Sequence, residues 1–181
     1  MVGTGGSDSE FLRPFAVDAL GEEEVVQTVE AGPAECRAIA RRLGLEALGS
    51  LRAELRLKRQ GGGPLVRLTG RFEAAVGQLC VVSLEPLEQQ LAEAFSQLYS
   101  LEPPALEGDL ELTLEDEDLP EEVRDGIIDL GEAVVQQLAV ALDPYPRRPE
   151  AEVPPGLQAG QEEEAANPFA ALKVLKGGRQ G

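Results

Sequence analysis

Cys80 and Ser83 are spaced like the two thiols of a Cys-x-x-Cys zinc motif, in the stretch "GQLCVVSLEP". Two thiolates at this spacing converge on a tetrahedral zinc ion, and two further nitrogen or sulfur ligands complete the site. Here the second position is a serine, the other cysteine of the chain is Cys36, and histidine is absent from all 181 residues. One chain therefore cannot supply four such ligands, and we expect no structural zinc site.

Catalytic chemistry also lacks its usual residues. A cysteine nucleophile of the papain kind needs a histidine base, which this chain does not contain. No nucleophile–base pair or cofactor fingerprint occurs, and Gly61–Gly63 lack the Lys-Ser/Thr that follows a phosphate-binding loop. We therefore expect that the protein is not an enzyme and uses no cofactor, metal or small-molecule substrate. A redox role for the Cys80 thiol stays an open alternative.

Both cysteines are expected to be reduced and packed rather than bridged. The N-terminal "MVGTGGSDSE" has neither a basic start nor an apolar run, and the chain has no stretch of about 18 uninterrupted apolar residues. These features predict a cytoplasmic protein that does not contact a membrane, and cytoplasmic thiols stay reduced. Cys36 and Cys80 then behave as small buried apolar residues.

Charge is distributed unevenly along the chain. The net charge is −17. Residues 37–71 contain nine basic and two acidic residues, a local charge of +7, whereas residues 102–132 contain thirteen acidic residues and Arg124, a local charge of −12. The overall charge opposes nucleic-acid binding, so any such binding must use the basic segment. The sequence predicts an electrostatic dipole.

The basic segment has the pattern of a β-hairpin. Over residues 48–59 leucine or alanine alternates with charged residues, and alternation resumes over residues 64–76 after a loop at Gly61–Gly63. A period of two places one face on a core and the other in water. The outer face of this predicted hairpin gathers Arg52, Arg56, Lys58, Arg67 and Arg71.

Two helices are indicated by spacing and end signals. Residues 33–43 start with a proline, carry apolar residues at helical spacing and stop at Gly44. The second helix has Asp129 as its N-cap and Glu132 three residues later, a capping box, and ends before Pro144.

Strands are expected at three further places, and one segment is ambiguous. Residues 11–18, 25–30 and 110–114 read as short strands. The apolar residues of segment 87–99 satisfy both a period of two and a spacing of four, and local propensity favours a helix.

The expected fold class is α+β. We expect a disordered arm at 1–9, one mixed body at 10–147, an acidic Pro/Gly-rich linker at 148–166 and a short terminal helix at 167–177. The body is predicted to be a small domain in which an antiparallel sheet with a central hairpin packs against two or three helices, followed by a flexible C-terminal tail.

Three blocks in this order resemble the YceD family, the large ribosomal RNA subunit accumulation protein: "GRFEAAVGQLCVVSLEP", "IIDLGEAVVQQLAVALDPYPR" and "NPFAALKVLK". The resemblance implies a small mixed α/β body and a strand, rather than a helix, at 87–99. Many members have a second cysteine where this chain has Ser83, so a metal role does not carry over. We interpret the turn that contains Cys80 and Ser83 as a structural element of the fold, which the Ser83 hydroxyl stabilises. The family-motif positions, interpreted as structural, are Cys80, Glu85, Pro86, Asp129, Asn167, Pro168 and Phe169.

The resemblance implies a non-enzymatic role in bacterial or plastid ribosome biogenesis, supporting accumulation of large-subunit (23S) ribosomal RNA. Two mechanisms are open. The basic hairpin face contacts ribosomal RNA or a large-subunit precursor, or the protein is an acidic adaptor or chaperone for a basic ribosomal protein. A third interpretation makes the five cations a solvated hairpin face. The acidic contact predicted for the adaptor consists of Glu115, Asp116, Glu117 and Asp118.

Overall fold

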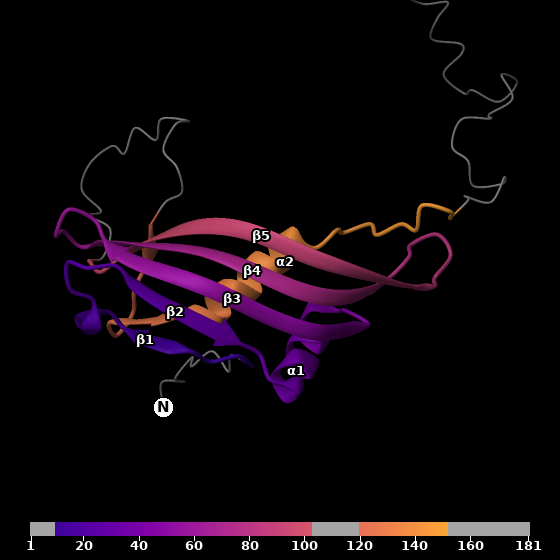
Figure 1. Ribbon diagram of the computed structural model, residues 1–181, viewed down its shortest axis with the longest axis horizontal. Coiled ribbons are helices and arrows are strands. Elements are labelled where there is room, and N and C mark those ends of the chain that lie inside the picture. The colour runs from indigo at the N-terminus through magenta and orange to yellow at the C-terminus, as the bar shows by residue number, and fades with distance from the viewer. Residues whose placement is uncertain (1–9, 103–119, 152–181) are drawn as a thin grey trace, which may run out of the picture.

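One long, curved β-sheet forms the framework of the protein. The computed structural model describes residues 10–102 and 120–151. Within them the five strands of the sheet lie in the spatial order β2–β3–β4–β5–β6. They are β2 (Val25–Glu30), β3 (Ala47–Arg59), β4 (Leu65–Leu79), β5 (Pro86–Ser100) and β6 (Glu121–Glu122). Figure 1 shows the three longest, β3, β4 and β5, side by side.

The first four strands of the sheet are antiparallel to their neighbours, as predicted. β6 is the exception, because it runs parallel to β5 and pairs with Tyr99 and Ser100 alone. With two α-helices among the described residues, the fold is α+β.

The predicted hairpin is confirmed as β3 and β4. Its alternation translates directly into burial: Leu51, Leu55 and Leu57 are fully buried on the inner face, whereas the charged residues between them are exposed. Each fully buried leucine contributes about 1.5–3 kcal/mol relative to an exposed one. The hairpin loop turns at Gly61 and Gly62, both with positive φ (56° and 72°), a conformation that other residues rarely adopt.

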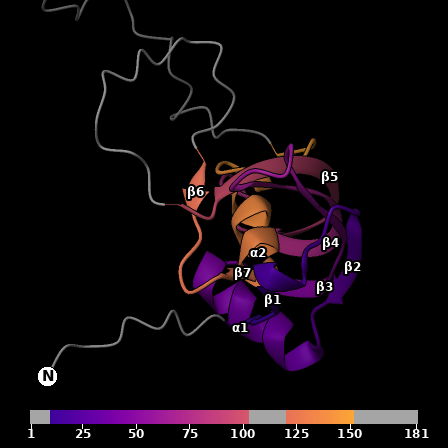
Figure 2. The same cartoon turned by 90° about the vertical axis from the view of Figure 1, so that its left-hand side faces the viewer.

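The inner face of the sheet is covered by α2 (Leu130–Ala141), around which the strands curve (Figure 2). Its predicted start is confirmed, because one oxygen of Asp129 accepts hydrogen bonds from the backbone N–H groups of Gly131 and Glu132 at 3.0 and 3.2 Å. Leu130, Val134 and Leu138 are buried in the same core as the hairpin leucines.

The other predicted helix is confirmed as α1 (Pro33–Leu43), which packs against β3. It ends at Gly44, whose φ of 66° lies in the left-handed region. Arg42 in its last turn donates to the carboxylate of Glu132 at 2.6 and 2.7 Å, so Glu132, which was predicted to complete a capping box, joins α1 to α2.

Segment 87–99 lies in strand β5, so the local preference for a helix is wrong and the strand that the family resemblance implies is confirmed. The reason is tertiary: all fifteen residues of β5 are in register with β4, from Pro86 opposite Leu79 to Ser100 opposite Leu65. The pairing satisfies the backbone groups of β5 that face β4, which outweighs a small difference in propensity.

The predicted strand at 25–30 coincides with β2, whereas the strand predicted at 11–18 is shorter than expected. Only Pro14–Ala16 form β1, which pairs with β7 (Ile127–Asp129) in a separate two-stranded sheet. The chain then turns through the 3-10 segment η1 (Val17–Ala19), because the N–H of Leu20 donates back to the carbonyl of Val17.

Several predictions concern residues outside the described ranges. These are the arm at 1–9, the strand at 110–114, most of the linker at 148–166 and the terminal helix at 167–177. Among the described residues, no helix is long and apolar enough to cross a bilayer.

Candidate functional site

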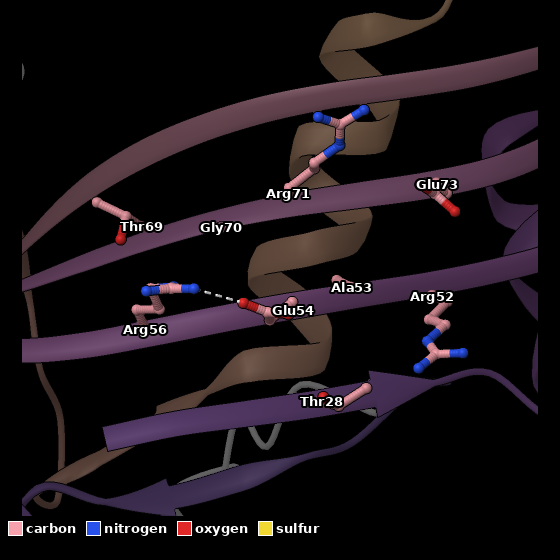
Figure 3. A pocket seen from close by; sticks show the side chains of 9 residues that line it. All are labelled: Thr28, Arg52, Ala53, Glu54, Arg56, Thr69, Gly70, Arg71 and Glu73. Atoms are coloured by element: carbon pink, nitrogen blue, oxygen red, sulfur yellow. Dashed lines mark hydrogen bonds and ion pairs between the residues drawn. The ribbon is translucent and has the colours of Figure 1, made fainter. Parts of the chain in front are cut away.

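The outer face of the sheet, on the side away from α2, brings together the five predicted cations. Register places Arg52, Arg56 and Lys58 of β3 beside Arg67 and Arg71 of β4. A shallow hollow of about 520 Å³ lies over the middle of this face, and its lining includes Arg52, Arg56 and Arg71 (Figure 3). The sequence pattern therefore identified the side chains that share this surface.

Carboxylates occupy the same face and balance part of the positive charge. Arg56 forms ion pairs with Glu54 at 2.8 Å and with Glu24 at 3.6 Å. The hydrogen bond that Arg56 donates to Glu54, followed by the charges of Glu54 and Glu24, raises the pKa of Arg56. Register also places Glu73 opposite Arg52. Glu54 lies two residues before Arg56 on the same strand, so alternation already places it on this face, whereas the positions of Glu24 and Glu73 beside the cations depend on register.

The charge is least balanced toward the hairpin loop. There Lys58 lies directly opposite Arg67, and neither forms an ion pair within residues 10–102 and 120–151. Arg67 donates to the hydroxyl of Ser96 on β5 at 3.1 Å, a neutral partner. Like charges directly opposite each other destabilise a sheet, and a bound anion relieves that repulsion. We call Lys58 and Arg67 the loop-end cation pair.

Cys80 lies in the turn that joins β4 to β5, and this turn is tied to the chain segment after α2. The thiol is fully buried, and its sulfur accepts hydrogen bonds from the backbone N–H groups of Ser83 at 3.4 Å and Arg148 at 3.5 Å. Arg148 also binds Glu85 at 2.6 Å, and the Ser83 hydroxyl accepts from the N–H of Glu85 at 3.4 Å. Pro86 then begins β5.

The surroundings shift the pKa values of the two thiols in opposite directions. Hydrogen bonds from the side chain and backbone of Ser83, and then from the backbone of Arg148, lower the pKa of Cys80 to about 6, although desolvation acts in the opposite direction. Burial is the main cause that raises the pKa of Cys36. Both cysteines are free thiols. In the part of the chain that the structure describes, no three side chains of the Cys, Asp or Glu type converge as metal ligands do.

Among the other predicted positions, Asp129 has a clear structural role. Besides capping α2, it accepts a hydrogen bond from the backbone N–H of Arg13 at 2.9 Å, so it fixes the N-terminal segment to the helix. The predicted acidic contact and the motif at the end of the chain lie outside the described residues; they comprise Glu115, Asp116, Glu117, Asp118, Asn167, Pro168 and Phe169.

The described residues form an α+β domain with a mixed charged outer sheet face and a buried thiol in the turn between β4 and β5. Residues 68–176 match the family model described as large ribosomal RNA subunit accumulation protein YceD. The match covers more than half of the chain, and the protein belongs to this family. The family is named for accumulation of large-subunit ribosomal RNA and not for an enzymatic activity.

A search of curated proteins and a search of solved structures each found no match. The family match begins at Leu68 in β4, so β3 and four of the five outer-face cations precede it. The family match therefore does not extend to those four cations.

Proposed function

We propose that this protein is a non-enzymatic ribosome biogenesis factor that contacts large-subunit ribosomal RNA, or a precursor of the large subunit, through the outer face of its sheet. The family supports the connection with large-subunit RNA. The proposed contact is the loop-end cation pair, with the neighbouring Arg52, Arg56 and Arg71 at its border.

The observation that carries this proposal is the position of Lys58 directly opposite Arg67. Nothing in the hairpin core requires two cations at these outward positions, and their mutual repulsion costs stability in the free protein. A phosphate group placed between them removes the repulsion and accepts hydrogen bonds from both side chains. The backbone of an RNA laid across the outer face of the sheet supplies such phosphate groups.

The competing interpretation is a solvated face that the protein's own carboxylates balance. Arg56 fits that interpretation, because Glu54 and Glu24 already pair with it. Reversing Arg56 would therefore disturb internal ion pairs as well as any RNA contact. The loop-end cation pair is the better place to separate the two interpretations.

The test is co-sedimentation of the full chain with large-subunit precursors at a low and a high salt concentration. We expect Lys58→Glu with Arg67→Glu to weaken binding at low salt by at least about tenfold, and to reduce its salt dependence, because two phosphate contacts are lost. This double variant keeps equal charges opposite each other, so it does not add a new cross-strand attraction.

A matched control changes the net charge equally at a different surface. Arg37 and Arg41 are exposed on α1, and neither lines the hollow on the outer face. Arg37→Glu with Arg41→Glu should retain most of the binding. If the two double variants lose binding equally, total charge rather than the outer face determines the interaction, and the proposed contact is wrong.

A second candidate function is that of an acidic adaptor for a basic ribosomal protein. The net charge of −17 favours it, since such a charge attracts cationic partners and repels RNA. For this candidate, replacing Glu115, Asp116, Glu117 and Asp118 with their amides should weaken binding to the basic partner. Reversal of the loop-end cation pair should have no effect on that binding.

A further inference from the structure

A second hollow lies at the opposite side of the sheet from the cationic face, beside the first turns of α2. It has a volume of about 470 Å³ and is formed where the ends of β5 and β6 approach β7 and α2. Its lining includes four carboxylates, one guanidinium and one phenol: Glu121, Glu122, Asp129, Glu132, Arg124 and Tyr99. None of these residues belongs to the predicted RNA contact.

Two of the four carboxylates are already occupied by the protein itself. Asp129 accepts the backbone hydrogen bonds that cap α2 and hold Arg13, and Glu132 is bound by both terminal nitrogens of Arg42. The other two are Glu121 and Glu122. Glu121 accepts a hydrogen bond at 2.5 Å from Gln97, a neutral donor, and neither Glu121 nor Glu122 forms an ion pair with any described residue.

Tyr99 distinguishes this hollow from an ordinary solvated acidic surface. It is only 6% exposed and lines the hollow, yet its hydroxyl forms no hydrogen bond with any residue in the described ranges. The hydroxyl oxygen is not among the fully buried atoms that lack a partner, so it opens into the hollow, where a bound group can reach it. Burial, and then the charges of Glu121 and Asp129, raise the pKa of Tyr99, so the phenol stays protonated next to these carboxylates.

A further acceptor is unsatisfied next to this group. The Oε1 atom of Gln97, on the same side chain that donates to Glu121, is buried without a hydrogen-bond partner. The hollow thus presents two carboxylates without an ion pair among the described residues and a phenol oxygen, with an unsatisfied amide oxygen adjoining Glu121. All of these groups accept hydrogen bonds, and the carboxylates favour a positive charge. Arg124 also lines the hollow, and the four carboxylates outnumber it, so the excess charge is negative.

We propose that this hollow binds an arginine side chain of a basic protein partner. A guanidinium has five N–H donors in a planar fork, so it can donate hydrogen bonds to a carboxylate and a neutral oxygen at the same time. Its flat, weakly hydrated surface also suits a site with a buried aromatic ring. A phosphate would be repelled by the same carboxylates, and the described residues lack the converging ligands that a metal ion requires.

This inference goes beyond the proposed RNA contact, because it assigns another site and another class of partner. The RNA contact and the arginine site use opposite faces of the sheet, so one molecule can hold both partners. The arginine site also differs from the acidic contact at residues 115–118, which lies outside the described residues.

The chain offers a direct reporter for the site. It contains no tryptophan and two tyrosines, Tyr99 and Tyr145. Tyr145 is exposed and does not line the hollow. In the full-length Tyr145→Phe variant, tyrosine fluorescence therefore comes from Tyr99 alone. We expect a hexa-arginine peptide to change this emission to saturation, and hexa-lysine to do so only at a higher concentration.

The Glu121→Gln and Glu122→Gln changes, added together to that variant, should raise the hexa-arginine concentration at half-saturation by at least about tenfold, because charge-assisted hydrogen bonds are lost. Glu22 and Glu23 are also adjacent, exposed glutamates. Their double change to glutamine removes the same charge outside the hollow and should leave the half-saturation concentration nearly unchanged.

Three results would overturn the arginine site. The first is that hexa-arginine does not change the Tyr99 emission. The second is that both glutamine double variants raise the half-saturation concentration equally. The third is that hexa-lysine changes the emission at the same concentration as hexa-arginine. Because no RNA is present, the outcome is independent of the co-sedimentation experiment, and either proposal can fail while the other stands.

Discussion

At the residue scale, Cys80 shows how a turn sets the chemistry of a single side chain. Its sulfur is enclosed by the turn at residues 80–85 and by the backbone of Arg148, and the N–H groups aimed at it stabilise a thiolate. The turn therefore supplies the donors that suit a thiolate, including the backbone N–H of Ser83.

We predict that Cys80 titrates near pH 6, the value to which its surroundings lower its pKa, whereas a free thiol titrates at about 8.5. Between these two pH values the folded protein holds a thiolate while the unfolded chain holds a thiol. The contribution of Cys80 to the free energy of unfolding therefore rises with pH across this window and is lost as pH falls through 6. The ultraviolet absorbance of the thiolate, followed against pH in a Cys36→Ala background, measures the midpoint.

The Ser83→Ala variant provides the control. Because the Ser83 side chain is the largest cause of the lowered pKa, its removal should move the midpoint upward. A Cys80 midpoint at the ordinary thiol value in both proteins would show that the turn does not stabilise the thiolate.

At the scale of secondary-structure elements, the packing of α2 against the N-terminal segment depends on Gly131. A Cβ atom at this position would overlap the backbone carbonyl oxygen of Phe11 and lie 2.8 Å from its carbonyl carbon. Backbone atoms cannot move aside as a flexible side chain can. We predict that Gly131→Ala lowers the free energy of unfolding by about 3 kcal/mol, measured by urea denaturation.

Gly21→Ala is the matched change, because no heavy atom lies within 4 Å of the added Cβ and the residue has no positive φ. It should alter stability by less than about 0.5 kcal/mol. Equal midpoints for the two variants would contradict the close approach of α2 to Phe11.

The elements that sequence predicts well are those whose signals are local. The hairpin follows from alternation around a glycine loop, and both helices follow from their caps and apolar spacing. β5 does not, because its apolar residues fit two periods and pairing with β4 decides between them. The family resemblance supplied that information, which no local pattern contains.

The same difference between local signals and long-range pairing applies to the candidate sites. Alternation predicted which five cations share the outer face, but the pairing of Arg56 with Glu24 and the opposition of Lys58 and Arg67 depend on register. The hollow around Tyr99 was not predicted, because it joins the end of β5 to residues 121–136. No sequence signal marks such a junction of distant segments.

At the scale of the whole molecule, arginine–glutamate pairs connect segments that are far apart in sequence. Arg42 joins α1 to Glu132 of α2, and Arg13 donates to both carboxylate oxygens of Glu35 at 2.8 and 2.9 Å. Glu35 also accepts the backbone N–H of Gly32 at 2.7 Å, so the same carboxylate caps α1. These contacts stabilise the fold, whereas the self-repulsion of a chain with a net charge of −17 destabilises it.

Acidification therefore has two opposing effects on this protein: it relieves the general repulsion among carboxylates, and it removes the specific contacts of Glu35. The hydrogen bond from Arg13 is the main cause that lowers the pKa of Glu35, so its contribution is present at neutral pH and is lost as pH falls through that lowered value. We predict that Glu35→Gln lowers the free energy of unfolding by about 1 kcal/mol at pH 7 and has a smaller effect at pH 3. Urea denaturation at both pH values measures the difference, with Glu23→Gln as the control for loss of one negative charge. A destabilisation of equal size at both pH values would show that the charge on Glu35 does not stabilise the fold.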